Sequence, residues 1–340
     1  MKIGIVNDLA VALEALRRVL ALRPDHAVIW AARDGAQAVA LCEQETPDLV
    51  LMDLIMPGTD GVEATRQIMA ATPCAILVVT SSVGVNAARV FDAMGHGAID
   101  AVDTPVLGRG DLQESAAAFL HKIDTVAKLV GTRRFIPSAD TFTDTWIITR
   151  RERLVAIGAS AGGPAALTAV LLSGLPKDFP AAVVIVQHVD ERFAQGMADW
   201  LSRDSALPVR VAKEGDRPTA GTVLLAGTND HLAFISSERI GYRSEPREQA
   251  YRPSVDVFFA SVGAHWPGEA VGVLLTGMGR DGAKGLKSLR DKGHYTIAQD
   301  QATSTVYGMP KAAAALSAAV DILPLERIAP RLVDTFRHKL

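Results

Sequence analysis

The sequence predicts an α/β protein with an N-terminal doubly wound domain, built on a five-stranded parallel sheet, and a C-terminal domain with a mixed, mostly parallel sheet. Three observations predict this. Short β-branched runs alternate with helical stretches in the first third of the chain, which indicates a parallel sheet with helices on both faces. A polar, turn-prone stretch then breaks this pattern, and a new apolar strand follows it. We assign residues 1–122 to the first domain, 123–150 to a linker and 151–340 to the second domain.

The first domain is expected to contain five strands, at Ile3–Val6, Val28–Ala31, Asp48–Met52, Ala75–Thr80 and Ala98–Val102. Helical patterns lie between them, for example at Val11–Leu22 and Gly61–Ala71. The polar residues that mark the linker are Gly131–Arg134 and Pro137–Thr145.

The second domain is expected to contain strands at Leu154–Gly158, Ala182–Gln187, Val209–Ala212, Thr222–Ala226, Leu232–Ser236 and Val271–Thr276. The stretch Val209–Tyr242 shows no helical pattern. It is therefore predicted to form a hairpin meander, which would be the antiparallel part of this domain.

Length and composition exclude several classes of protein. The 340 residues are 49% hydrophobic and 21% charged, with a net charge of −3, which is globular composition without the basic excess of a nucleic-acid-binding protein. Cys42 and Cys74 belong to no CxxC pair, so a disulfide framework and a cysteine zinc site are excluded. No apolar run reaches the ~18 residues of a membrane span. Asn7 and Asp8 make the start polar too early for a signal peptide. We therefore expect a cytoplasmic protein with no membrane insertion.

Charge is divided unevenly between the two domains. Residues 1–122 carry 9 Lys and Arg against 15 Asp and Glu, a net charge of −6, and the rest of the chain carries +3. This asymmetry supports two units with different surfaces that can attract each other.

Polar residues stand at the strand ends of the first domain, the edge where open α/β sheets bind ligands. Asn7 and Asp8 follow the first strand, Asp53 follows the third and Thr80 ends the fourth. Alone, Asp53 could equally serve as a helix N-cap or a turn former. Two carboxylates that converge at one edge instead form an oxygen-rich pocket that suits Mg²⁺, and Mg²⁺ lets a phosphoryl group approach a carboxylate.

These residues resemble the receiver domain of two-component response regulators. The resemblance covers residues 1 to about 122, and it rests on the acidic end of the first strand, the motif D-x-x-M-P-x-x-D-G at Asp53–Gly61, Thr80 and Pro105. It implies that Asp53 accepts a phosphoryl group from a CheA-type histidine kinase and that Thr80 contacts the phosphoryl oxygens. It also implies that Asp8, Asp53 and the backbone carbonyl of Ile55 bind Mg²⁺.

Two positions depart from the receiver pattern. Asn7 replaces the first of two adjacent acids, and its neutral oxygen should weaken Mg²⁺ binding without abolishing it. Thr104 replaces the Lys before the last Pro, which removes a cation that normally pairs with the phosphoryl group. We expect a smaller activation on phosphorylation than in relatives that keep the Lys.

The second domain carries the motif G-x-S-x-G at Gly158–Gly162, between an expected strand and the helical pattern Pro164–Leu172. A strand-to-helix turn of this kind exposes the hydroxyl of Ser160 and leaves helix N–H groups nearby to hold an oxyanion. Two other interpretations stay open on this segment alone. A glycine-rich turn also cradles phosphates, and it can serve packing only.

A serine nucleophile needs a base and a group that orients the base. His188 follows the next strand, one βα unit after Ser160, and Asp281 follows the strand Val271–Thr276. Each has a plainer role when considered alone: His188 in the core or as a cap, and Asp281 in a glycine-loop turn or as an N-cap. All three stand at strand ends on one edge, so a triad is predicted, since triads are recognised by geometry rather than by order in the chain.

The other histidines compete weakly for a catalytic role. His231 precedes a strand, where it either lines the cleft or caps a turn, and His96 and His265 lie in loops without a nucleophile. No HExxH motif or pair of histidines at ligand spacing indicates zinc.

Five stretches of the second domain resemble CheB protein-glutamate methylesterases, in the same order along the chain. They are GASAGG (158–163), the strand that ends in QH (187–188), RPSVDVFF (252–259), LLTGMGRDGA (274–283) and AQDQATSTVYGMP (298–310). With the receiver ahead of it, the whole architecture resembles CheB. The resemblance implies Ser160 as nucleophile, His188 as base, Asp281 as the acid that orients it, and the backbone N–H of Met278 as an oxyanion donor. Ala161 and Gln301 depart from the family, which often has Thr and Glu there.

The resemblance implies hydrolysis of glutamate γ-methyl esters, and deamidation of glutamines, on the cytoplasmic helices of a methylated chemoreceptor-like protein. It implies no cofactor for the esterase and Mg²⁺ for the receiver, which should cover the esterase cleft until it is phosphorylated. Asn7 and Thr104 make the receiver similar to that of the Wsp-type surface-sensing branch of the family, whose output is a diguanylate cyclase.

Two alternative functions are a binding module with an inert hydrolase fold and a nucleotide-binding protein that uses the turn 158–163. The latter lacks a P-loop Lys and the spacing of G-x-G-x-x-G.

Overall fold

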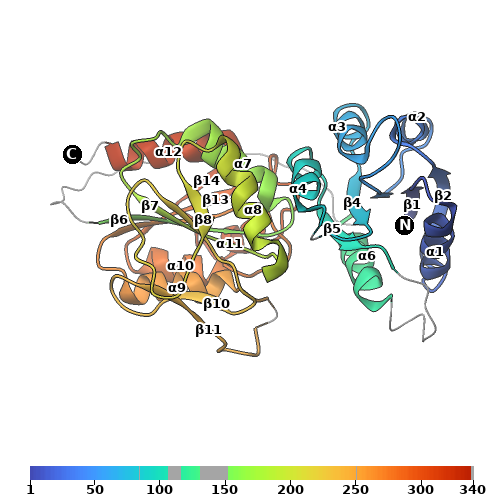
Figure 1. Ribbon diagram of the computed structural model, residues 1–340. Helices are drawn as coiled ribbons and strands as arrows, with labels where there is room; N and C mark the ends of the chain where they lie inside the picture. Colours follow the sequence, from blue (N-terminus) through green and yellow to red (C-terminus); the bar gives the residue numbers. More distant parts are fainter. Residues whose placement is uncertain (84, 106–115, 131–151, 250, 338–340) are drawn as a thin grey trace. The chain divides into compact units, whose positions relative to one another are not determined.

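A computed structural model describes residues 1–83, 85–105, 116–130, 152–249 and 251–337. The chain divides into two compact units, Met1–Arg134 and Phe135–Leu340 (Figure 1). Most of the expected linker, residues 131–150, lies outside the described residues. Within the described ranges, no helix is both long and apolar enough to cross a membrane.

The N-terminal unit is a doubly wound α/β domain, as predicted. Its five strands are all parallel and follow the order β2-β1-β3-β4-β5. The strands are β1 (Lys2–Val6), β2 (Ala27–Ala32), β3 (Leu49–Met52), β4 (Ala75–Thr80) and β5 (Asp100–Asp103). The helices are α1 (Ala10–Leu20), α2 (Gly35–Gln44), α3 (Gly61–Ala71), α4 (Ala87–Gly95) and α6 (Ala117–Val130).

One buried cluster joins α1 and α6 to the sheet. It combines strand residues such as Ile5 and Leu51 with Leu16 of α1 and with Ile123 and Val126 of α6. Burial of this apolar surface is the main stabilising contribution to the unit. The helix α6 extends past residue 122, and its second half contributes to the core of the N-terminal unit.

The C-terminal unit is built on a seven-stranded parallel sheet in the order β14-β13-β12-β6-β7-β9-β8. Its strands are β6 (Arg153–Ala159), β7 (Ala182–Gln187), β8 (Val209–Val211), β9 (Val223–Leu225), β12 (Glu269–Leu274), β13 (Tyr295–Gln299) and β14 (Asp321–Leu323). One face is covered by α7 (Gly163–Gly174), α8 (Glu191–Asp204) and α12 (Leu325–Arg337) (Figure 1). The other is covered by α9 (Val255–His265), α10 (Ala283–Asp291) and α11 (Met309–Ala315).

The predicted meander is wrong for its first two strands. β8 and β9 pair in parallel, and only β10 (His231–Phe234) and β11 (Ile240–Arg243) form an antiparallel hairpin. Residues 212–222 connect β8 to the parallel strand β9 without a helix. They are held against β11 by backbone hydrogen bonds from Gly215 N–H to the Ile240 carbonyl and from Ile240 N–H to the Asp216 carbonyl, both 2.9 Å.

The central strands β12, β6 and β7 lie next to one another, so their carboxyl ends meet at one edge. The segments that follow these strands begin at Leu275, Ser160 and His188. The fold therefore brings together three loops that are far apart in the sequence.

Candidate active site and phosphorylation site

Ser160 lies on a tight turn between β6 and α7. Its backbone N–H donates to the Thr276 carbonyl (3.0 Å), and its carbonyl accepts from Gly163 N–H (2.7 Å). Gly162 has φ +74°, and a Cβ there would lie 2.5 Å from the Cβ of Thr305, so the turn requires glycine at this position. Gly277 also lies against the Ser160 turn, because a Cβ on it would come within 2.8 Å of the Ser160 Cβ.

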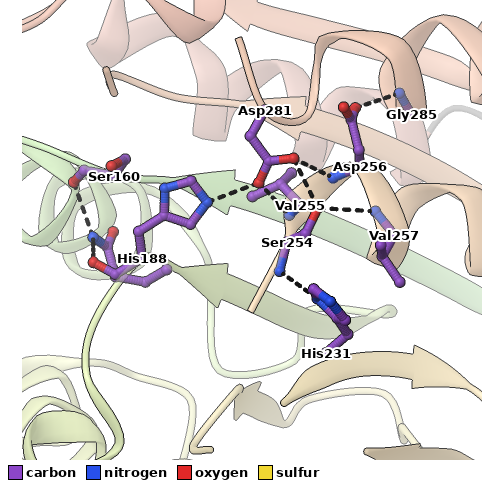
Figure 2. A network of polar contacts seen from close by, with 10 residues as sticks. Ser160, His188, His231, Ser254, Val255, Asp256, Val257, Asp281 and Gly285 are labelled. Atoms are coloured by element: carbon purple, nitrogen blue, oxygen red, sulfur yellow. Dashed lines mark hydrogen bonds and ion pairs between the residues drawn. The ribbon is translucent and has the colours of Figure 1, made fainter. Parts of the chain in front are cut away.

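His188 follows β7, the neighbour of β6. Its backbone N–H donates to the Ala159 carbonyl (3.0 Å), and the side-chain amide of Gln187 donates to the carbonyls of Ser160 (2.9 Å) and His188 (3.2 Å). These bonds tie the two strand ends together. Figure 2 shows the His188 ring reaching from the Ser160 side of the site toward Asp281.

The His188 ring binds Asp281 through Nε2, at 2.8 Å from Oδ2. Its other nitrogen, Nδ1, is buried and has no hydrogen-bond partner among the described residues. An ionised carboxylate can only accept, so Nε2 carries a hydrogen that it donates to Asp281. In the neutral form of the ring, the lone pair and hence the basic atom are at Nδ1.

Asp281 accepts four hydrogen bonds (Figure 2). Besides His188, the donors are the Ser254 hydroxyl (2.8 Å), Val255 N–H (2.7 Å) and Asp256 N–H (3.1 Å), at the start of α9. Burial favours the neutral acid, but the hydrogen bond and charge of His188 and the backbone donors outweigh it and hold the pKa of Asp281 below its ordinary value. The carboxylate is therefore ionised and fixed in place.

His231 does not face the serine. It is buried, its Nδ1 accepts from Ser254 N–H (3.0 Å), and its Nε2 lies 3.0 Å from the Pro246 carbonyl. Since Nδ1 accepts, Nε2 carries the hydrogen and donates to Pro246. His231 thus holds Ser254, which in turn binds Asp281.

The sequence did not reveal the contacts of Ser254 or Gln187. Ser254 stands before an apolar helical run, a pattern that indicates the N-cap observed for α9. Its additional bond to Asp281 joins positions 27 apart and has no local signal. The Met278 backbone N–H stays a prediction, although the adjacent Gly277 packs on the Ser160 turn.

In the N-terminal unit, the fold brings the predicted residues to one edge. Asp53 Oδ2 accepts from the Asn7 side-chain amide (2.9 Å), and Oδ1 accepts from Leu54 N–H (2.7 Å). Thr80, the last residue of β4, accepts from the Asn86 side-chain amide (2.9 Å). Its carbonyl accepts from Thr104 N–H (2.8 Å).

The orientation of Asn7 differs from the sequence expectation. Its side-chain oxygen accepts from Leu9 N–H (2.9 Å), which fixes the direction of the amide, and its nitrogen faces Asp53. The expected neutral oxygen is therefore engaged elsewhere, and Asn7 offers Asp53 a donor instead.

The remaining oxygen donors fit Mg²⁺. Burial and the charge of Asp8 raise the pKa of Asp53, against the backbone N–H groups of Ile55 and Leu54, which lower it. Two carboxylates that repel each other are the kind of oxygen donors that Mg²⁺ binds together with water. No group of three or more His, Cys, Asp or Glu suited to a metal occurs among the described residues.

Comparison with known proteins identifies a family for each of the two units. Residues 155–332 match the family model described as CheB methylesterase, and residues 3–116 match the response regulator receiver domain. The chain is 60% identical, over 99% of both chains, to a Pseudomonas putida protein named protein-glutamate methylesterase/protein-glutamine glutaminase of group 3 operon. It is 62% identical to protein-glutamate methylesterase/protein-glutamine glutaminase 4 of Burkholderia thailandensis, over 98% of this chain and 97% of that protein.

The crystal structure of the Thermotoga maritima CheB methylesterase catalytic domain gives a TM-score of 0.51 at 31% identity. It covers 55% of this chain and 100% of that one. The chain therefore belongs to the CheB family, as a methylesterase domain that follows a response-regulator receiver domain.

Proposed function

We propose that Ser160, His188 and Asp281 are the catalytic triad of this methylesterase, and that its substrate is a glutamate γ-methyl ester on a methylated chemoreceptor-like protein. The observation that carries this proposal is the hydrogen bonding of the two ring nitrogens of His188. Asp281 holds Nε2 at 2.8 Å, while Nδ1 is buried without a hydrogen-bond partner. His188 directly follows β7, the neighbour of the strand β6 that leads to Ser160. A base held in this way accepts a proton from a neighbouring hydroxyl.

The reaction runs in two halves. The Ser160 oxygen attacks the ester carbonyl as its proton passes to His188 Nδ1, and Asp281 stabilises the imidazolium that forms. The C–OCH₃ bond then breaks, and methanol leaves with the proton from Nδ1. In the second half, water attacks the acyl-enzyme while His188 takes a proton from it. Ser160 regains a proton, and the receptor keeps a carboxylate.

Glutamine deamidation follows the same course, because only the leaving group differs: ammonia takes the place of methanol. We assign the oxyanion of both tetrahedral intermediates to the Met278 backbone N–H, since the adjacent Gly277 packs against Ser160.

The receiver regulates the esterase in this proposal. Asp53 accepts a phosphoryl group from a CheA-type histidine kinase, and Asp8, Asp53 and the Ile55 carbonyl hold Mg²⁺. When bound, Mg²⁺ neutralises charge as the phosphoryl group approaches. Thr80 donates its hydroxyl hydrogen to the phosphoryl oxygens, since Asn86 occupies only the hydroxyl oxygen, as a donor. A substrate on the cytoplasmic helices of a receptor implies a cytoplasmic protein. The relative from a group 3 operon supports a surface-sensing system of the Wsp type.

Methanol release from a methylated receptor tests the function directly. The full-length wild-type protein should release one methanol for each methyl ester on the receptor that it converts to a carboxylate. A folded protein that binds the receptor but releases no methanol would be a binding module with an inert hydrolase fold.

The Asn7→Asp variant is expected to bind Mg²⁺ more tightly, by about tenfold. The substitution replaces an amide that donates to Asp53 with a third carboxylate, and Mg²⁺ relieves the added repulsion. Mg²⁺ titration followed by calorimetry measures the change. Asn7→Ala, which removes the amide without adding charge, is the control, and equal affinities for Asn7→Asp and wild type would refute this description of the pocket.

Removal of the receiver is expected to raise unphosphorylated esterase activity several-fold. Residues 1–134 carry a net charge of −4 and residues 135–340 a net charge of +1, and opposite charges favour attraction between the two units. Phosphorylation of Asp53 can weaken this attraction only if the phosphoryl group interacts differently with the inhibited and the active states of the protein. The cut belongs after Arg134, because Ile123 and Val126 are part of the receiver core. Rates of methanol release decide the matter, and equal rates would leave the receiver a docking role only.

A further inference from the structure

Tyr251 lies face to face with His188. The two ring centroids are 4.4 Å apart and the ring planes differ by 4°. Tyr251 is half-buried and belongs to the segment between β11 and α9. Neither the sequence pattern nor the proposed triad gives this residue a role.

The segment that carries Tyr251 is anchored on the same acid that holds His188. Three and four residues further on, the Ser254 hydroxyl and Val255 N–H donate to Asp281, and Ser254 N–H donates to His231. The His188 ring is thus fixed at one edge by Asp281 and on one face by Tyr251.

The Tyr251 hydroxyl reaches the loop that follows β12. A Cβ on Gly279 would lie 2.9 Å from the hydroxyl oxygen, and Gly279 has φ +81°. Burial and the charge of Asp281 both raise the pKa of Tyr251, so the phenol is neutral. A neutral, electron-rich ring attracts a cation placed over its face.

We infer that Tyr251 is a positioning residue for the base. Its ring fixes the plane of the imidazole so that Nδ1 stays available to Ser160, and its face stabilises the imidazolium that forms when Nδ1 takes the serine proton. The inference rests on the proposed function. It predicts an effect on chemistry rather than on receptor binding, because the contact is with His188.

Two substitutions in the full-length protein separate the ring from the hydroxyl. Tyr251→Leu removes the aromatic face and keeps much of the bulk, whereas Tyr251→Phe keeps the ring. For methanol release from a methylated receptor, Tyr251→Leu should lower kcat about tenfold with KM changed less than about twofold. Tyr251→Phe should restore most of the wild-type kcat.

A second measurement omits the receptor. A fluorophosphonate forms a covalent bond to an activated serine with loss of fluoride, and its rate of reaction with Ser160 should fall in Tyr251→Leu by a similar factor. Thermal unfolding checks that the variant is folded, and Tyr251→Met repeats both measurements if it is not.

Three outcomes would overturn this inference. They are a wild-type kcat in Tyr251→Leu, a loss in Tyr251→Phe as large as in Tyr251→Leu, and a raised KM with unchanged kcat. Each can occur while wild-type protein releases methanol and Ser160→Ala does not, so the triad would survive. Methanol release by Ser160→Ala at the wild-type rate would overturn the triad and the role of Tyr251 together.

Discussion

The Ser160→Ala variant is expected to release methanol from a methylated receptor at least about 10⁴-fold more slowly than wild type. The substitution removes the only atom that forms a bond to the substrate carbonyl. The turn itself should persist, because Ser160 is held through its backbone N–H and carbonyl and Gln187 bonds to that carbonyl.

The matched control is Ser288→Ala, which removes a hydroxyl on α10, outside the network of Figure 2. It should keep the wild-type rate, and both variants should unfold thermally near the wild-type midpoint. Methanol release by folded Ser160→Ala at more than a few per cent of the wild-type rate would exclude a serine nucleophile at this position.

The Asp281→Asn variant is expected to lower kcat by about 10³- to 10⁴-fold. Both carboxylate oxygens accept from two donors, so an amide nitrogen must face a donor in either orientation. Where it faces His188, the ring turns into the tautomer with hydrogen on Nδ1. That atom can no longer take the proton of Ser160, although the serine is present.

Asp256→Asn is the control for loss of a neighbouring negative charge. The Asp256 carboxylate accepts from Gly285 N–H at 2.7 Å and does not touch His188, so this variant should lose less than about tenfold. Equal losses in Asp281→Asn and Asp256→Asn would show that general charge, rather than the His188 contact, matters.

The sequence predicted the parts of the fold that follow local patterns. Apolar runs separated by helical stretches gave the parallel sheet of the N-terminal unit, and the polar residues at its strand ends are adjacent in the structure. The direction of β8 and β9 was missed because a crossover without a helix has the same local pattern as a hairpin. The short strands β13 and β14 were missed as well.

The sequence predicted that the residues of the candidate site share one edge of the sheet, but it did not predict their contacts. Strand-end positions placed His188 and Asp281 on the correct edge, and these residues do bind each other. Which imidazole nitrogen faces Asp281 depends on the orientation of the His188 ring in the folded protein, which no local sequence pattern indicates. The same holds for the Asn7 amide, whose orientation is set by a backbone N–H two residues away, and for the stack of Tyr251 on His188.

The acyl-enzyme on Ser160 is the central claim of this mechanism, and partitioning with hydroxylamine tests it most directly. Hydroxylamine competes with water for an acyl-enzyme and leaves a hydroxamate on the receptor. Matched receptors that carry either the methyl ester or glutamine at one position are incubated with the full-length protein, and incubations without protein correct for direct attack. A shared intermediate predicts the same ratio of hydroxamate to carboxylate from both substrates. Different ratios, or no hydroxamate from either, would contradict a common acyl-enzyme on Ser160.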